Sequence, residues 1–290
     1  MAPRLGFAGL GVMGGPMAGH LLREHGALTI WNRTPSKSEQ LRSDGAAVAG
    51  SLEELGKACD IVFLCVNRSE DVREVVEGLL RGAAKGCLFV DHSTIAPPAA
   101  QQLASDLHTE GYRFVDAPVT GGSMGAQKGQ LTIFCGGAEN DVAEAMEAMK
   151  PYTKRAERMG PSGSGQMAKM ANQIAVGGAL LALCEALSFA KKAGLDVALT
   201  RELLAGGAGG SWAFDNYGPK ILAEDWSPGF SIINQRKDFG YCREAATSID
   251  AAIPGTQLVD ELLKRLQDEG HGEWTTAALY EQIMRMGAAD

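Results

Sequence analysis

The sequence predicts an α/β fold: a doubly wound parallel sheet, followed by an all-helical part. Short apolar runs of strand length alternate with helical patterns in the first part of the chain, and beyond about residue 161 only helical patterns continue. A stretch at 166–193 is rich in Ala, Leu and Met and contains no proline. As a helix it would span about 40 Å, long enough to bridge two domains. We therefore predict domains at residues 1–161 and 162–290, joined by this interdomain helix.

The individual elements follow from the same patterns. Strands are expected at residues 4–8, 28–31, 61–66, 87–90, 113–115 and 131–135. Helices are expected at 14–24, 36–44, 52–57, 69–80 and 97–110 in the first part, and at 166–193, 199–205, 213–223, 237–248, 256–269 and 275–286 in the second. Strands that alternate with helices at this spacing are typical of a parallel sheet, because each parallel connection needs a crossover.

Composition narrows the class of protein. The net charge is 27 − 35 = −8 and no block of basic residues occurs, which argues against nucleic acid and anionic membranes as partners. Six cysteines lie scattered without metal-ligand spacing, and five histidines are equally dispersed. We expect reduced thiols in a cytoplasmic protein, and no metal site.

A glycine-rich turn follows the first predicted strand and opens a helix. Its residues are Gly9, Leu10, Gly11, Val12, Met13 and Gly14. Such a turn lets the backbone approach a pyrophosphate, whose charge the helix N-terminus stabilises. A GxGxxG pattern alone is weak evidence and fits a purely structural turn as well. Its position at the start of a β-α repeat favours dinucleotide binding.

The second strand ends at Asn32, Arg33 and Thr34, where NAD-binding proteins often carry an acidic residue for the ribose 2′-hydroxyl. A forked guanidinium instead suits a 2′-phosphate, so we expect NADP to be preferred, with NAD possible. The alternative is that Arg33 is merely solvated. Val66, Asn67 and Thr94 should line the same crevice, since they follow later strands. His92 has no acid or ligand partner at a useful spacing, and we interpret it as structural.

Lys169 and Asn172 lie three residues apart near the start of the long helix, so both side chains project from one face. Their neighbours are small or apolar, which predicts a partly desolvated lysine near the positive end of the helix dipole. Both effects lower a lysine pKa and suit a general acid/base. A solvated lysine near a helix start is the alternative interpretation.

A second glycine-containing segment follows the strand predicted at 113–115. Thr120 and Ser123 offer hydroxyls there, and Gly121 and Gly122 leave amides that can cup a carboxylate, although a plain connecting loop would look similar. Lys237 stands with Asp238 at a predicted helix start, where a surface ion pair is the ordinary explanation.

Four of these motifs, in the same order along the chain, resemble the β-hydroxyacid dehydrogenase family. They are Gly9-Leu-Gly-Val-Met-Gly14, Asp116-Ala-Pro-Val-Thr-Gly-Gly122, Gly163-Ser-Gly-Gln-Met-Ala-Lys-Met-Ala-Asn172 and Lys237-Asp238. The resemblance spans essentially the whole chain. It implies an N-terminal Rossmann domain, an all-helical C-terminal domain, an active site between them, and a homodimer or homotetramer.

The resemblance also implies residue roles. Lys169 would be catalytic, with Asn172 holding the substrate beside it. Thr120, Gly121 and Gly122 match the loop that binds the substrate carboxylate. Thr94 and Lys237 match cofactor contacts, Lys237 also facing the substrate.

The implied reaction is reversible hydride transfer between NADP(H) and a small 3-hydroxy acid or its semialdehyde. Asn67-Arg68 stands where the family often has proline. Gly210-Ser-Trp-Ala213 is similar to the 3-hydroxyisobutyrate branch, whereas Asn32-Arg33-Thr34 is similar to NADPH-dependent glyoxylate and succinic semialdehyde reductases. Imine reductases share the architecture but usually lack the lysine. A non-catalytic dinucleotide-binding module is the remaining alternative.

Overall fold

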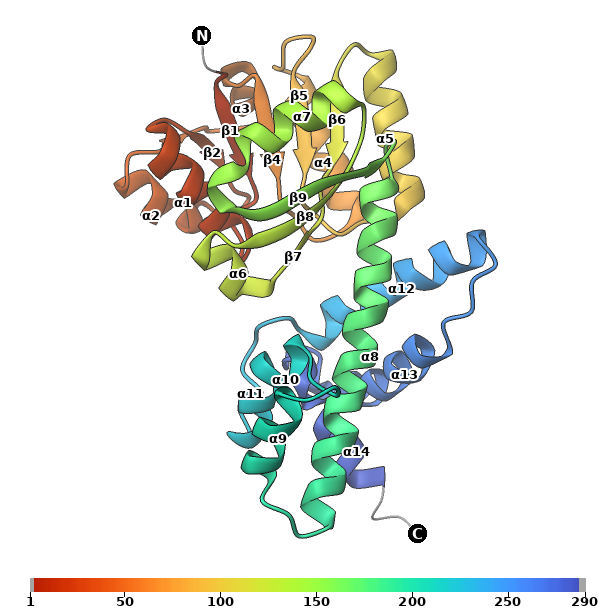
Figure 1. The fold of residues 1–290 in the computed structure, drawn as a ribbon. Coiled ribbons are helices and arrows are strands. Elements are labelled where there is room, and N and C mark those ends of the chain that lie inside the picture. Colours follow the sequence, from red (N-terminus) through yellow and green to blue (C-terminus); the bar gives the residue numbers. More distant parts are fainter. Residues whose placement is uncertain (1–2, 287–290) are drawn as a thin grey trace. The chain divides into compact units, whose positions relative to one another are not determined.

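A computed structural model describes residues 3–286, and the chain forms two compact units. The first runs up to Lys169 and contains the sheet, and the second starts at Met170 and is helical (Figure 1). The predicted fold class is confirmed. The sequence-based boundary at residue 161 precedes the long helix α8 (Ser164–Lys192), whereas the two units divide within it, after Lys169.

The first unit is built on one sheet. Within the described residues its strands follow the order β3-β2-β1-β4-β5-β6-β8-β7, and β9 pairs with β8. The strands are β1 (Leu5–Ala8), β2 (Thr29–Trp31), β3 (Ala47–Val48), β4 (Ile61–Leu64), β5 (Leu88–Asp91), β6 (Arg113–Asp116), β7 (Val119–Thr120), β8 (Leu131–Gly136) and β9 (Thr153–Gly160). The section from β3 to β6 is parallel, as predicted. The strand β8 departs from the predicted parallel arrangement, because it runs antiparallel to β6 and β7.

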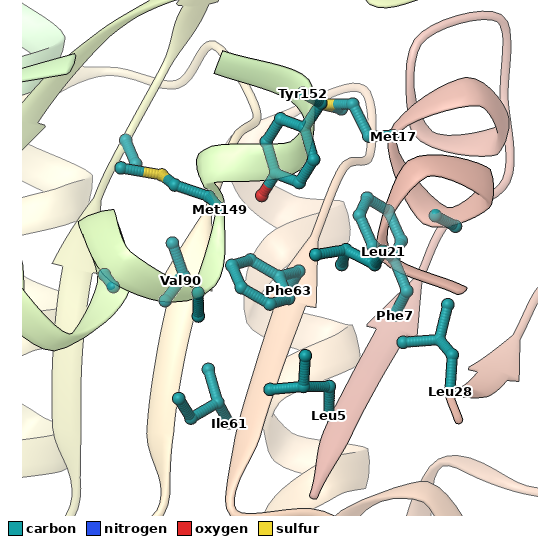
Figure 2. Packing of buried hydrophobic residues seen from close by; sticks show 14 of the residues in the cluster. Leu5, Phe7, Met17, Leu21, Leu28, Ile61, Phe63, Val90, Met149 and Tyr152 are labelled. Carbon is teal, nitrogen blue, oxygen red and sulfur yellow. The ribbon is translucent and has the colours of Figure 1, made fainter. Parts of the chain in front are cut away.

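Helices cover both faces of the sheet. They are α1 (Gly14–His25), α2 (Glu39–Ser43), α3 (Leu52–Ala58), α4 (Ser69–Leu80), α5 (Pro97–Thr109), α6 (Gly122–Lys128) and α7 (Glu139–Ala148). Alternate residues of a strand enter opposite cores, as the pleat requires. In β4, Phe63 packs in the core under α1, where Phe7, Met17 and Tyr152 surround it (Figure 2). Its neighbour Leu64 joins the core beneath α3 and α4.

Several elements of the first unit lay outside the predictions. The strands β3, β7 and β9 and the helices α6 and α7 were not anticipated. β9 reads Thr-Lys-Arg-Ala-Glu-Arg-Met-Gly, so it lacks the apolar run of a buried strand. Among the described strands it pairs with β8 alone. The segment around Thr120, for which a plain connecting loop is the alternative interpretation, forms a short strand followed by the first turn of α6.

The second unit continues α8 and adds α9 (Val197–Ala205), α10 (Trp212–Asn216), α11 (Gly218–Leu222), α12 (Ile232–Ser248), α13 (Pro254–Leu266) and α14 (Leu279–Met286). The single helix predicted at 213–223 is broken at Tyr217, just before Gly218 and Pro219. The helix predicted from Lys237 starts at Ile232, because the Ser231 side chain caps it by accepting from the N–H of Asn234. Lys237 therefore lies inside α12 and not at its start.

Among the described helices, α8 alone is long and apolar enough to cross a membrane. Length and composition are the whole of that evidence, and a buried core helix of a soluble protein meets the same criteria.

Candidate functional site

The backbone geometry of the turn between β1 and α1 requires glycine at two positions. Gly9 has φ +96°, and a Cβ there would lie 2.2 Å from the Cys65 carbonyl oxygen. A Cβ on Gly14 would lie 1.9 Å from the Gly9 carbonyl oxygen, so both glycines are required by the packing of the chain itself. Gly11 differs, because a Cβ there meets nothing within 4 Å.

Open space therefore adjoins the middle glycine, and α1 begins at this space without a side-chain cap on its first amides. Unsatisfied N–H groups at a helix N-terminus favour an anion. Of the three other residues of the turn, Leu10 is buried, Met13 is half-buried and Val12 is 65% exposed. The turn fits the pyrophosphate of a dinucleotide.

Asn32 ties the glycine-rich turn to the end of β2. Its Oδ1 accepts from the N–H of Leu10 at 2.8 Å, and its Nδ2 donates to the carbonyl of Thr34 at 2.8 Å. The amide thus fixes the backbone on both sides. Arg33 points outward with its side chain 76% exposed, and its guanidinium lies 3.6 Å from Asp71 on α4. Such an exposed pair contributes little stability, so Arg33 can exchange this partner for another anion.

The ends of β4 and β5 are joined by a serine. Ser93 accepts through Oγ from the N–H of Val66 at 2.9 Å, and its own N–H donates to Asp91 Oδ1 at 2.9 Å. Thr94, the next residue, is half-buried, and Asn67 is exposed. The predicted cofactor residues Val66 and Thr94 therefore stand on neighbouring strand ends that a shared hydrogen bond holds in place.

His92 is buried and fully bonded. Its Nδ1 donates to the carbonyl of Ala117 at 2.8 Å, and its Nε2 lies 2.8 Å from the Tyr152 hydroxyl. The ring stacks on Phe63 with centroids 5.7 Å apart. Burial lowers the pKa of His92 to about 4, although the bond to Ala117 opposes that shift. This environment agrees with the structural interpretation of His92.

Lys169 lies on α8 and is 7% exposed. Its Nζ donates to the carbonyl of Val119 at 2.9 Å. Val119 precedes Thr120 in β7, so the amine lies beside the segment in which Gly121 (φ +126°) and Gly122 (φ +64°) turn the chain into α6. Thr120 and Ser123 are half-buried. The structure thus brings the predicted lysine and the predicted carboxylate-binding residues together within the first unit.

Asp116 was not singled out from the sequence beyond its place in a motif. Its carboxylate accepts from the N–H of Gly163 at 2.7 Å, just before α8, and from that of Gln166 at 2.9 Å, in the first turn of α8. Burial raises the pKa of Asp116 to about 7, while these two backbone donors act in the opposite direction. The sequence gives Gln166 no role beyond its place in a motif. Its side chain donates to the Ser93 carbonyl at 2.8 Å and accepts from the Ile95 N–H at 3.2 Å.

The remaining predicted residues, Asn172 and Lys237, belong to the second unit. Asn172 donates to the Gln173 side chain at 2.9 Å, and Gln173 donates to Asp238 at 2.7 Å. The other oxygen of Asp238 lies 3.2 Å from Lys237 Nζ. A chain of contacts thus connects the two predicted residues through Gln173 and Asp238, which are 3% and 2% exposed.

Across residues 3–286, no group of three His, Cys, Asp or Glu side chains is placed to hold a metal ion.

Comparison with known proteins identifies the class. Residues 4–160 match the family model for the NAD binding domain of 6-phosphogluconate dehydrogenase. Residues 163–283 match the model described as the NAD-binding part of NADP-dependent 3-hydroxyisobutyrate dehydrogenase. Together with the glycine-rich turn, these matches define a nicotinamide dinucleotide-dependent oxidoreductase that acts on CH–OH groups.

Individual relatives cover nearly the whole chain. A probable 3-hydroxyisobutyrate dehydrogenase-like protein of Arabidopsis thaliana is 38% identical over 98% of this chain and 86% of its own length. The 2-hydroxy-3-oxopropionate reductase of Escherichia coli is 32% identical over 98% of both chains. A structure of Mycobacterium tuberculosis 3-hydroxyisobutyrate dehydrogenase with L-serine has a TM-score of 0.88 at 26% identity, covering 98% of this chain and 99% of the other. The chain belongs to the β-hydroxyacid dehydrogenase family.

Proposed function

We propose that this protein is an NADP(H)-preferring dehydrogenase/reductase. It would interconvert a small 3-hydroxy acid, 3-hydroxyisobutyrate-like, and the corresponding semialdehyde. The observation that carries the proposal is the buried Lys169 amine, 2.9 Å from the Val119 carbonyl and beside the Thr120–Gly122 segment. A protonatable group and a set of anion-binding groups at one place suit an acid whose hydroxyl must gain or lose a proton.

The dinucleotide would be held by the glycine-rich turn and the strand ends. Gly9–Gly14 would receive the pyrophosphate, and Val66, Asn67 and Thr94 would line the nicotinamide side. When bound, the nicotinamide ring supplies hydride transfer to or from the carbon that carries the substrate oxygen. For the adenosine end, Arg33 offers a forked cation, with Asn32 and Thr34 shaping the backbone beside it. This supports a preference for the phosphorylated cofactor, and the second family model is likewise named for an NADP-dependent enzyme.

Lys169 would take the hydroxyl proton during oxidation and return it during reduction. Amides at Gly121 and Gly122, with the hydroxyls of Thr120 and Ser123, would hold the substrate carboxylate, because correct orientation supplies much of the rate. Asn172 would hold the substrate near the reacting carbon, and Lys237 would contact both substrate and cofactor.

We also propose that the protein forms a homodimer or homotetramer and that it is cytoplasmic. The second unit exposes large apolar side chains at the end of α8 and on α9, including Phe189 (73% exposed) and Leu203 (68% exposed). Such a surface supports self-association. The six cysteines all lie in the described part of the chain and form no disulfide there, which supports a reducing compartment.

NADPH-dependent reduction of glyoxylate or succinic semialdehyde is the second candidate, favoured by Asn32-Arg33-Thr34. A substrate panel separates the two candidate functions. It contains succinic, methylmalonate and tartronate semialdehydes and glyoxylate, each with NADPH, and 3-hydroxyisobutyrate, 3-hydroxypropionate and L-serine, each with NADP. A cyclic imine belongs in the same panel as a test of imine reduction. Tight NADPH binding with no turnover of any member would favour a non-catalytic module.

The central test replaces the lysine. Lys169→Ala should lower turnover at least about a hundredfold and leave the NADPH dissociation constant nearly unchanged, because only proton transfer is lost. Lys85→Ala is the control; that exposed lysine lies over the Tyr112 ring, 4.1 Å from its centroid. Turnover by Lys169→Ala within a few-fold of the wild type would remove Lys169 from this role.

A further inference from the structure

A carboxylate and an amide hold the first turn of α8 from two directions. Asp116, at the end of β6, accepts from the N–H groups of Gly163 and Gln166, which precede and open the helix. The Gln166 side chain binds the backbone of Ser93 and Ile95 on either side of Thr94. The start of the helix is therefore fixed to the strand end that carries a proposed cofactor contact and to the strand that leads into the proposed carboxylate-binding segment.

Asp116 is closely packed against two glycines. A Cβ on Gly136 would lie 2.5 Å from Asp116 Oδ1, and a Cβ on Gly165 would lie 2.8 Å from Asp116 Oδ2 and 2.4 Å from the Phe134 carbonyl oxygen. Two glycines on different elements thus allow β6, β8 and α8 to close around one side chain. Asp116 itself is fully buried.

Lys169 is linked to Asp116 both through α8 and through the segment that follows β6. Asp116 accepts from the N–H of Gln166 in the first turn of α8, and Lys169 lies three residues further on, about one turn along the helix. Its Nζ returns to β7 through the Val119 carbonyl, three residues after Asp116. A shift of the carboxylate would therefore move the amine against Thr120–Gly122.

We propose that Asp116 is a positioning residue, which sets the place of the Lys169 amine relative to the Thr120–Gly122 segment by capping α8 from β6. This inference rests on the proposed role of Lys169. The carboxyl group is suited to the task because its two oxygens accept from both backbone donors at the positive end of a long helix. Asp116 need touch neither substrate nor cofactor.

The test is a double-mutant cycle between Asp116→Asn and Lys169→Ala. Asparagine keeps the size of the side chain but turns an N–H group towards one of the two backbone donors. We expect Asp116→Asn to lower kcat about ten- to a hundredfold, as for a catalytic group displaced by about 1 Å, with the NADPH dissociation constant within about threefold. Because Asp116 acts through Lys169, the double variant should lose no more than Lys169→Ala alone.

The control is Asp196→Asn, the same substitution at a carboxylate that accepts from the N–H of Leu199 and caps α9. It should leave kcat unchanged. Losses from Asp116→Asn and Lys169→Ala that multiply in the double variant would overturn the inference, as would a change confined to the NADPH dissociation constant. Full turnover by Lys169→Ala would instead overturn the proposed function, and this inference with it.

A measurement on the wild-type enzyme covers the case in which Asp116→Asn fails to fold. The amides of Gly163 and Gln166 should exchange hydrogen for deuterium at least about a hundredfold more slowly than that of Leu199, since their acceptor is buried while the α9 cap is exposed. Equal exchange rates would show that the carboxylate does not hold the turn, and would overturn the proposal.

Discussion

The buried His92 should make the stability of the protein depend on pH in a defined window. Its ring is 2% exposed, and burial lowers its pKa from 6.5 to about 4. In the unfolded chain the ordinary pKa applies. Between pH 6.5 and 4, the unfolded state therefore holds a proton that the native state excludes, and the free energy of unfolding decreases as the pH falls.

The size of this effect follows from the same two values. A tenfold change in proton affinity corresponds to about 1.4 kcal/mol, so the contribution of His92 amounts to about 3 kcal/mol lost between pH 7 and pH 4. Above pH 6.5 the histidine is neutral in both states and contributes no slope. Asp116 acts in the opposite sense, because its pKa is raised to about 7 in the native state. The total slope thus mixes several groups, and a comparison with a variant is needed.

His92→Asn removes the titrating ring and isolates its part. Urea unfolding followed by tryptophan fluorescence at pH 7, 6, 5 and 4.5 gives the free energy of unfolding of each protein. The variant should be less stable at pH 7, and the gap to the wild type should narrow steadily as the pH falls. Tyr152→Phe is the matched control: it removes the hydroxyl partner of His92 but keeps the ring, so it should lower stability at every pH with the wild-type slope. A gap between His92→Asn and the wild type that stayed constant from pH 7 to 4.5 would refute the reasoning.

Two further predictions concern the cofactor site. Arg33→Asp should reduce the preference for NADPH over NADH at least about tenfold, since a charge-assisted bond to the 2′-phosphate is replaced by repulsion. The ratio of kcat/KM for the two cofactors measures this preference, and Arg42→Asp on α2 is the control. An unchanged ratio in Arg33→Asp would reject the phosphate assignment. Gly14→Ala should abolish folding, because its Cβ would lie 1.9 Å from a backbone oxygen. Gly11→Ala has open space around its Cβ, so this variant should fold but bind NADPH weakly. Equal thermal stability of the two variants would contradict this prediction.

The elements that the sequence predicts well are those whose own residues suffice to define them. β1, β4 and the first three residues of β5 are short runs of buried apolar residues, and the turn after β1 needs glycine for its own backbone. The long helix α8 is likewise evident from an uninterrupted apolar pattern. By contrast, β9 is polar and pairs with β8 at the edge of the described sheet, so nothing within its eight residues distinguishes it from a loop.

The same distinction holds for the candidate site. The lysine and the glycine-rich segments could be recognised as residue types suited to a task. Asp116 could not, because its role depends on amides some fifty positions away along the chain. Asn32 was expected near the ribose for its place in a motif, and its hydrogen bonds to Leu10 and Thr34 emerge only when β1 and β2 are paired. One signal was available in retrospect: Ser231 before two isoleucines is a helix start, which would have placed Lys237 inside α12.

The cap on α8 also bears on how the enzyme can be divided. A Rossmann fragment cut at residue 161 would look reasonable by sequence, yet it would discard the N–H groups of Gly163 and Gln166. Asp116 would then be left without its two backbone donors, and a polar group that loses its hydrogen-bond partners costs about 1–3 kcal/mol. A free-standing dinucleotide-binding fragment, or a chimera with a foreign helical half, should therefore keep the chain through Lys169, where the first unit ends.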